Sequence, residues 1–135
     1  MDCLALNMIV DTAMCDEDII NNPDLPEIIS SIQEKMQDIA NKLCAEYIAE
    51  PPQVIIPAEI NINYTGTYAL TNKKENKIVI YAIKKSNGCY YSQDYLFILD
   101  ALAHELSHYI FSMRHDNRWK VNYLIIKQKI GALLL

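Results

Sequence analysis

The three histidines of the chain lie in one short stretch, in which His104-Glu105-Leu106-Ser107-His108 is followed by His115. The spacing is H-E-x-x-H, and on a helix two positions four apart lie one turn apart on the same face. His104 and His108 can therefore direct a ring nitrogen at the same Zn²⁺. The pattern predicts a zinc site in which both imidazoles are ligands.

A zinc ion that does chemistry commonly has three protein ligands and one open position, so a third ligand is expected. After His108 the chain contains no glutamate and no cysteine, and the candidates are His115 and Asp116. We favour His115, because neutral imidazole is a preferred zinc ligand while Asp116 suits the N-cap of a following helix. On an unbroken helix His115 would lie about 10.5 Å beyond His108, so the chain must turn back near Ser112 to Arg114.

Glu105 lies beside His104 but about 100° further round the helix, within reach of the open coordination position. It is the predicted general base. Zinc would lower the pKa of a water, Glu105 would take its proton, the hydroxide would attack a carbonyl, and Glu105 would hand the proton to the leaving amine. Asp100, one turn before His104, either accepts a ring N–H of a ligand or is a lone surface carboxylate. The tyrosines considered for stabilising an oxyanion are Tyr64, Tyr68, Tyr81, Tyr90 and Tyr91, and the sequence does not choose among them.

The composition predicts a single domain over residues 1–135, with a tail of unassigned role at residues 1–24. With 51% hydrophobic residues among 135, the chain can bury a core without a metal or disulfides, so a zinc ion here is expected to be catalytic. The four cysteines have no C-x-x-C pair, which favours free thiols over a zinc ribbon or a disulfide scaffold. Blockade of the zinc by a thiolate of Cys3 or Cys15 is a weaker hypothesis.

The charge is unevenly placed along the chain, whose net charge is -5. Residues 1–60 hold twelve acidic and two basic side chains, or -10, and residues 61–135 hold five acidic and ten basic ones, or +5. The overall acidity does not support nucleic-acid binding. No apolar run reaches 18 residues, so no membrane partner is expected, and Asp2 stands where a signal peptide has a basic region. These features predict a cytoplasmic protein.

The apolar pattern predicts a helix, then strands, then two further helices. A helix begins after Asp24 with Pro26 in its first turn, and Pro51-Pro52 lies beyond its end. Residues 53–56, 64–70 and 77–83 are strand-like, and the polar residues 72–76 join the last two into a hairpin. After a loop at 84–88, an almost wholly apolar helix covers 95–113, and a last helix capped by Asp116 runs to Gly131. The predicted class is α+β, with a short antiparallel sheet.

The segment Ala101-Leu102-Ala103-His104-Glu105-Leu106-Ser107-His108, followed by His115-Asp116-Asn117-Arg118-Trp119, resembles the SprT-like, WLM and YgjP-like minimal zinc metallopeptidases. In that group H-E-L-x-H is followed by a third histidine and then an aromatic residue. The resemblance also covers Gly66-Thr67-Tyr68 and Ile78-Val79-Ile80, and it spans residues 53–120. It implies a small zincin-like domain in which His104, His108 and His115 bind Zn²⁺ and Glu105 is catalytic. It also implies that the strand from Ile78 to Tyr81 is an edge that pairs with an extended protein or peptide substrate.

Three functions are therefore predicted, in order of preference. The first is a zinc-dependent metallopeptidase. The second is an ImmA-like regulatory protease that acts on one repressor, a kind of protein that commonly uses an acidic third ligand. The third is a non-catalytic, zinc-stabilised module that binds peptides. Glu105→Gln separates the first from the third, since only a peptidase would lose turnover while keeping its metal.

Overall fold

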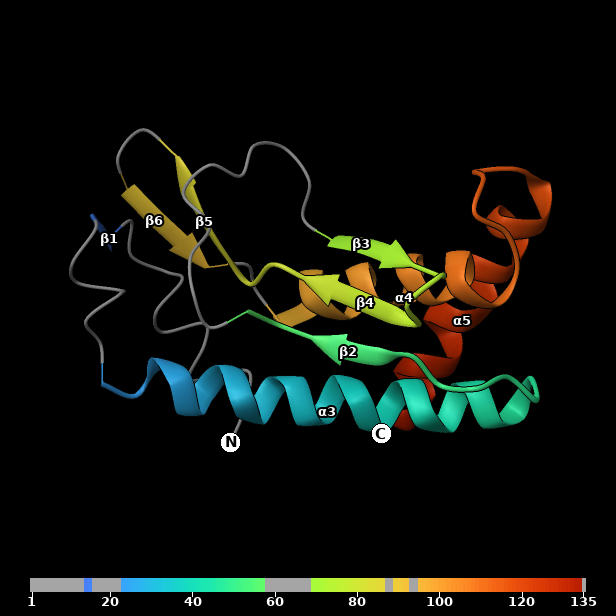
Figure 1. Cartoon of the computed structure of the whole chain (residues 1–135), viewed down its shortest axis with the longest axis horizontal. Helices are drawn as coiled ribbons and strands as arrows, with labels where there is room; N and C mark the ends of the chain where they lie inside the picture. The colour runs from blue at the N-terminus through green and yellow to red at the C-terminus, as the bar shows by residue number, and fades with distance from the viewer. Residues whose placement is uncertain (1–13, 16–22, 58–68, 87–88, 93–94, 135) are drawn as a thin grey trace.

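The computed structural model describes residues 14–15, 23–57, 69–86, 89–92 and 95–134 (Figure 1). In chain order its elements are β1 (Met14–Cys15), α3 (Leu25–Glu46), β2 (Gln53–Ile55), β3 (Ala69–Asn72), β4 (Lys77–Ile80), β5 (Ile83–Ser86), β6 (Cys89–Ser92), α4 (Tyr95–Ile110) and α5 (Asn117–Leu133). The predicted α+β class is confirmed. No helix in these ranges is both long and apolar enough to cross a membrane.

The N-terminal helix, α3, is confirmed at its predicted start. Asp24 is its N-cap residue and a proline stands in its first turn, where the missing N–H costs nothing. Apolar side chains recur every three or four residues on one face, and Ile32, Met36 and Leu43 are completely or almost completely buried. The helix ends at Glu46, before the two prolines, because Ile48 adopts a positive φ of 52° that breaks the helical conformation.

The sheet nearest α3 is mixed, which corrects the prediction of an antiparallel one. Its strand order is β2-β4-β3, and β2 runs parallel to β4 with Val54 opposite Ile78. The predicted hairpin of β3 and β4 is confirmed, since the two strands are antiparallel with Asn72 opposite Lys77. Asn76 in the connecting turn has a φ of 54°, a conformation that asparagine tolerates better than most residues.

The strand expected at the edge, residues 78–81, lies instead in the middle of the sheet, because β4 pairs with a strand on each side. The outer side of β2 is covered by α3. Gln37 Oε1 accepts a hydrogen bond of 2.8 Å from Val54 N, and Gln33 Oε1 accepts one of 2.7 Å from Ile56 N. On the opposite side, no strand among the described residues pairs with the outer edge of β3. Among the described residues, the unpaired edge of this sheet therefore belongs to β3.

The chain after β4 differs from the predicted loop. The strand expected over 77–83 ends at Ile80, and the segment 84–88 that was expected to be a loop contributes most of β5. β5 pairs antiparallel with β6, and β1 pairs with the other side of β6, so these strands form a second three-stranded sheet. The strand predicted over 64–70 lies outside the described residues except for its last two positions, which begin β3.

The H-E-x-x-H segment lies on α4, which is buried as its apolar composition predicted. Figure 1 shows α4 behind the sheet, where it contacts β3 and β4, with α5 packed against it. Ile98, Leu102 and Leu106 are completely buried, and they meet Ile78 and Ile80 of β4 in one core. The helix stops at Ile110 rather than Met113. This rigid, well-packed helix is what positions the histidines.

Candidate metal centre

The three histidines meet at one point although His115 follows the end of α4. The Nε2 atom of His108 lies 3.1 Å from that of His104 and 3.0 Å from that of His115. The Nε2 atoms of His104 and His115 are 3.2 Å apart. The three nitrogens therefore form a nearly equilateral triangle, and these residues form a group that could hold a metal ion.

These separations fit coordination better than hydrogen bonding. In a tetrahedral zinc site with bonds of 2.0–2.1 Å, neighbouring ligand nitrogens lie roughly 3.3 Å apart, close to the spacing of the triangle. Three Nε2 atoms of neutral imidazoles cannot form a closed set of three N–H···N bonds, because each nitrogen is either a donor or an acceptor and would have to be both. Three lone pairs converging on one cation satisfy the same geometry.

The tautomer of His108 also suits a metal ligand. Its Nδ1 lies 2.8 Å from the carbonyl oxygen of Ser112, which can only accept, so Nδ1 must carry the hydrogen. The Nε2 atom of the neutral ring then presents its lone pair to the other two histidines. A backbone carbonyl that orients a ligand imidazole in this way is a common feature of zinc sites.

The chain turns back in the predicted place. The amides of Phe111 and Ser112 both donate to the carbonyl of Ser107, which closes the last turn of α4. The hydroxyl of Ser112 donates to Asp116 Oδ2 at 2.8 Å and accepts from the amide of Arg114 at 3.2 Å. This compact turn brings His115 over the end of α4.

Asp116, the alternative third ligand, is used as a cap. Its Oδ1 accepts a hydrogen bond of 3.0 Å from Trp119 N at the start of α5, and its Oδ2 accepts the bond from Ser112. The hydrogen bond from the Trp119 amide, the largest influence, lowers the pKa of Asp116. Both carboxylate oxygens are thus engaged away from the histidines, and the structure places His115 in the cluster instead.

Trp119 forms a wall of the centre, a role that sequence reasoning did not assign to it. Its ring stacks on His108 with centroids 5.1 Å apart and an interplanar angle of 19°, and it meets His104 and His115 edge-on at 4.7 and 4.5 Å. Its Nε1–H donates to the carbonyl of His104 at 3.2 Å. Trp119 is buried, so it restricts the three imidazoles from one side. The sequence did carry a signal for this role, because Trp119 is the aromatic residue that follows the third histidine.

Glu105 lies beside the cluster in a buried position, with its side chain only 9% exposed. Its Oε2 is 3.7 Å from His104 Nε2, and its Oε1 accepts a hydrogen bond of 2.8 Å from the hydroxyl of Thr71 in β3. Burial raises the pKa of Glu105, whereas the hydrogen bond from Thr71 lowers it. The carboxylate thus lies beside the histidine cluster, in surroundings that on balance raise its pKa.

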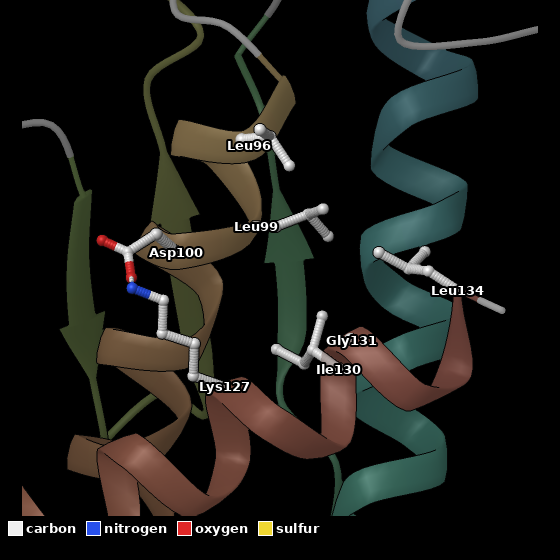
Figure 2. Close-up of a pocket in the computed structure, with 7 residues that line it drawn as sticks. All are labelled: Leu96, Leu99, Asp100, Lys127, Ile130, Gly131 and Leu134. Carbon is white, nitrogen blue, oxygen red and sulfur yellow. Dashed lines mark ion pairs between the residues drawn. The ribbon is translucent and has the colours of Figure 1, made fainter.

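Asp100 has neither of its two predicted roles, because two residues of α5 contact its carboxylate. Its carboxylate accepts from the Tyr123 hydroxyl and forms an ion pair of 3.0 Å with Lys127. Figure 2 shows this pair at one side of a cavity of about 350 Å³ between α4 and α5, lined mainly by leucine and isoleucine. The cavity contains none of the three histidines. Asp100 therefore links α4 to α5.

Most of the other predicted participants lie outside the described residues. These are Tyr64, Tyr68 and Cys3, together with the side chains of Tyr90, Tyr91 and Cys15. Tyr81 is partly buried directly after the end of β4. Tyr123 was not among the candidates, yet its ring lies 5.8 Å from that of His104 and stacks on Trp119. Thr71 and Tyr123 were missed because both depend on how distant elements dock.

Acid is expected to disrupt the centre. Burial and the neighbouring His108 and His115 lower the pKa of His104 from its ordinary 6.5, so the folded state favours the neutral ring. As the pH falls below about 6.5, the unfolded chain binds this proton first, and the stability of the zinc-free protein decreases. Above that pH His104 is neutral in both the folded and the unfolded chain, so its titration does not change the stability. Zinc should also be released in this range, because its ligands must be neutral.

A zinc competition titration between about pH 7.5 and about pH 5.5 checks this expectation. Glu105 acts with the opposite sign, since its raised pKa lets the folded state bind a proton more readily than the unfolded chain. The Glu105→Gln variant removes that contribution and isolates the histidines. A zinc affinity that does not change over this range would contradict the assignment of neutral imidazole ligands.

Comparisons with known proteins give no further identification. No protein-family model, no curated protein and no solved structure matches the chain. What the fold and the site define is an α+β protein with a three-histidine cluster that could hold a metal ion.

Proposed function

We propose that the chain is a zinc-dependent metallopeptidase that hydrolyses peptide bonds in protein or peptide substrates. His104, His108 and His115 are the proposed zinc ligands, and Glu105 is the proposed general base. The observation that carries the proposal is the convergence of three Nε2 atoms within 3.2 Å of one another, with the Glu105 carboxylate beside them.

The donor set favours zinc over harder cations. Three imidazole nitrogens suit Zn²⁺, whereas Mg²⁺ and Ca²⁺ prefer oxygen ligands. Three protein ligands leave a fourth position for water or substrate, as in catalytic zinc sites. A site that served only to stabilise the fold would more commonly have four protein ligands, and the core of this chain is already extensive.

In the proposed reaction the metal activates the water and the substrate carbonyl, and the side chain of Glu105 transfers the proton. Zinc bound at this site would make a water acidic and polarise the substrate carbonyl. Glu105 takes one proton from that water as its oxygen bonds to the carbonyl carbon, and then delivers the proton to the amide nitrogen as the C–N bond breaks. The burial of Glu105 supports this shuttle, because it brings the affinity of the carboxylate for a proton closer to what neutral pH requires.

The substrate is proposed to pair with the outer edge of β3. This strand lies against α4 and carries Thr71, which contacts Glu105, so a peptide added along it would pass the metal centre. Backbone hydrogen bonds would supply the affinity, and side-chain specificity would be weak. The glutamines of α3 occupy the opposite edge of the sheet, so in the part of the chain that the structure describes the outer edge of β3 is the one available for strand addition.

The geometry bears on the two competing functions differently. An ImmA-like site with an acidic third ligand is disfavoured, because Asp116 is committed to Trp119 and Ser112. A zinc-stabilised peptide-binding module would use the same histidines and the same strand edge. It differs only in having no use for the carboxylate of Glu105 next to the metal.

Removing and restoring the metal tests the proposal. We expect the zinc-loaded protein to cleave reduced, unfolded casein, chelation to abolish cleavage, and one equivalent of Zn²⁺ to restore it. Fragment release is followed by mass spectrometry, with Mg²⁺ added to a parallel sample as the control cation. A zinc-loaded, folded protein that binds casein without cleaving it would instead identify the binding module.

A further inference from the structure

Thr71 links the sheet to the candidate general base across a large distance in the sequence. Its hydroxyl oxygen lies 2.8 Å from Glu105 Oε1 and 3.1 Å from the backbone oxygen of Glu105. The hydroxyl has one hydrogen for these two acceptors, and the shorter contact is to the side chain. One residue of β3 thus touches both the carboxylate and the backbone of Glu105.

This contact decides which way the carboxylate faces. Glu105 is buried, with one carboxylate oxygen bonded to Thr71 and the other 3.7 Å from His104 Nε2. Rotation of the carboxylate away from the metal centre would break the bond to Thr71 and leave a buried acceptor without that partner. Since such a loss is costly, the bond restrains the carboxylate to the orientation in which its other oxygen lies beside the histidine cluster.

We propose that Thr71 is a positioning residue that aims the Glu105 carboxylate at the metal centre and ties it to the strand along which substrate binds. This inference rests on the proposed function. Because Thr71 belongs to β3, a peptide that pairs with the outer edge of β3 would order the strand that holds the base. Binding energy from the substrate backbone would then contribute to turnover as well as to affinity.

Steady-state kinetics of zinc-loaded variants on unfolded casein test the role. Thr71→Val keeps the shape of the side chain but removes the hydroxyl, and we expect kcat to fall by about tenfold to a hundredfold with KM changed less than about threefold. Thr71→Ser restores the hydroxyl and should recover most of kcat. Zinc affinity should be unchanged in both, because Thr71 does not contact the histidines.

Tyr109→Phe is the matched control. The Tyr109 hydroxyl also joins α4 to other elements, donating to the carbonyl of Glu50 at 2.9 Å, and lies 3.3 Å from Asn76 Oδ1 in the β3–β4 turn. Its removal loosens α4 in a comparable way without touching Glu105. We expect this variant to keep the kcat of the parent protein, so that a general weakening of the fold is separated from misplacement of the base.

A double-mutant cycle tests the contact without measuring activity. If Thr71 and Glu105 are bonded, Thr71→Val lowers the urea midpoint of the parent protein more than that of the Glu105→Ala variant. Equal shifts in the two backgrounds, or a Thr71→Val variant with the kcat of the parent, would overturn the proposal. If the parent protein cleaves nothing, the proposed function fails and the positioning role fails with it. Unequal midpoint shifts would then still establish the contact alone.

Discussion

Replacing Glu105 with glutamine is expected to lower kcat by about 10²- to 10⁴-fold while one equivalent of zinc stays bound. The amide has nearly the same shape and can still accept the hydrogen bond from Thr71, so the packing around α4 is preserved. It cannot accept a proton from water at neutral pH. Casein cleavage rates and the zinc content of the same preparation, measured together, give both parts of the result.

Glu34→Gln is the control for this substitution. Glu34 lies on the exposed side of α3, and the same change of charge there should leave both cleavage and zinc content unaltered. A Glu105→Gln variant that cleaves at the rate of the parent protein would remove Glu105 from the mechanism. A parent protein that binds zinc but has no activity to lose would favour the peptide-binding module.

Replacing His115 with alanine is expected to weaken zinc binding by more than about 100-fold and to abolish cleavage. The two remaining imidazoles, His104 and His108, would be too few to hold the ion in a fixed geometry. The loss should be specific to the metal, because His115 is exposed and its removal takes little from the core. Competition with a chromogenic chelator measures the affinity, and far-ultraviolet circular dichroism checks that the helices persist.

Asp116→Asn is the matched control for the third ligand. Asparagine caps helices about as well as aspartate, so the start of α5 should be retained, while a carboxylate ligand would be lost. We expect normal zinc affinity in this variant. The reverse pattern, with zinc lost in Asp116→Asn and kept in His115→Ala, would support the acidic-ligand site of an ImmA-like protease.

The histidine cluster was predictable because its geometry is mostly local. The spacing of His104 and His108 fixes their relation on any helix, and the 10.5 Å argument required the turn that the chain makes after Ile110. Asp100 shows where local reasoning fails. Its position one turn before His104 was read correctly, but Tyr123 and Lys127 of α5 compete for its carboxylate, and their approach depends on how two helices pack.

The arrangement of the strands was harder to predict than their existence. Alternating or β-branched residues mark a strand but do not say which strand lies beside it, so the parallel partner of β4 was missed. The unbroken apolar run from Ile78 to Ile80 was a signal for a central strand, since buried strands have such runs. Thr71 was overlooked for the same reason, because its contact with Glu105 exists only once β3 lies against α4.

The central claim is that three imidazoles bind one zinc ion, and X-ray absorption at the zinc edge tests it most directly. For the protein loaded with one equivalent of zinc, the account predicts three imidazole nitrogens at about 2.0–2.1 Å and no sulfur neighbour. A sulfur at about 2.3 Å would indicate a cysteine ligand, and a signal from only two imidazoles would remove His115 from the site. Either result would contradict the three-histidine centre.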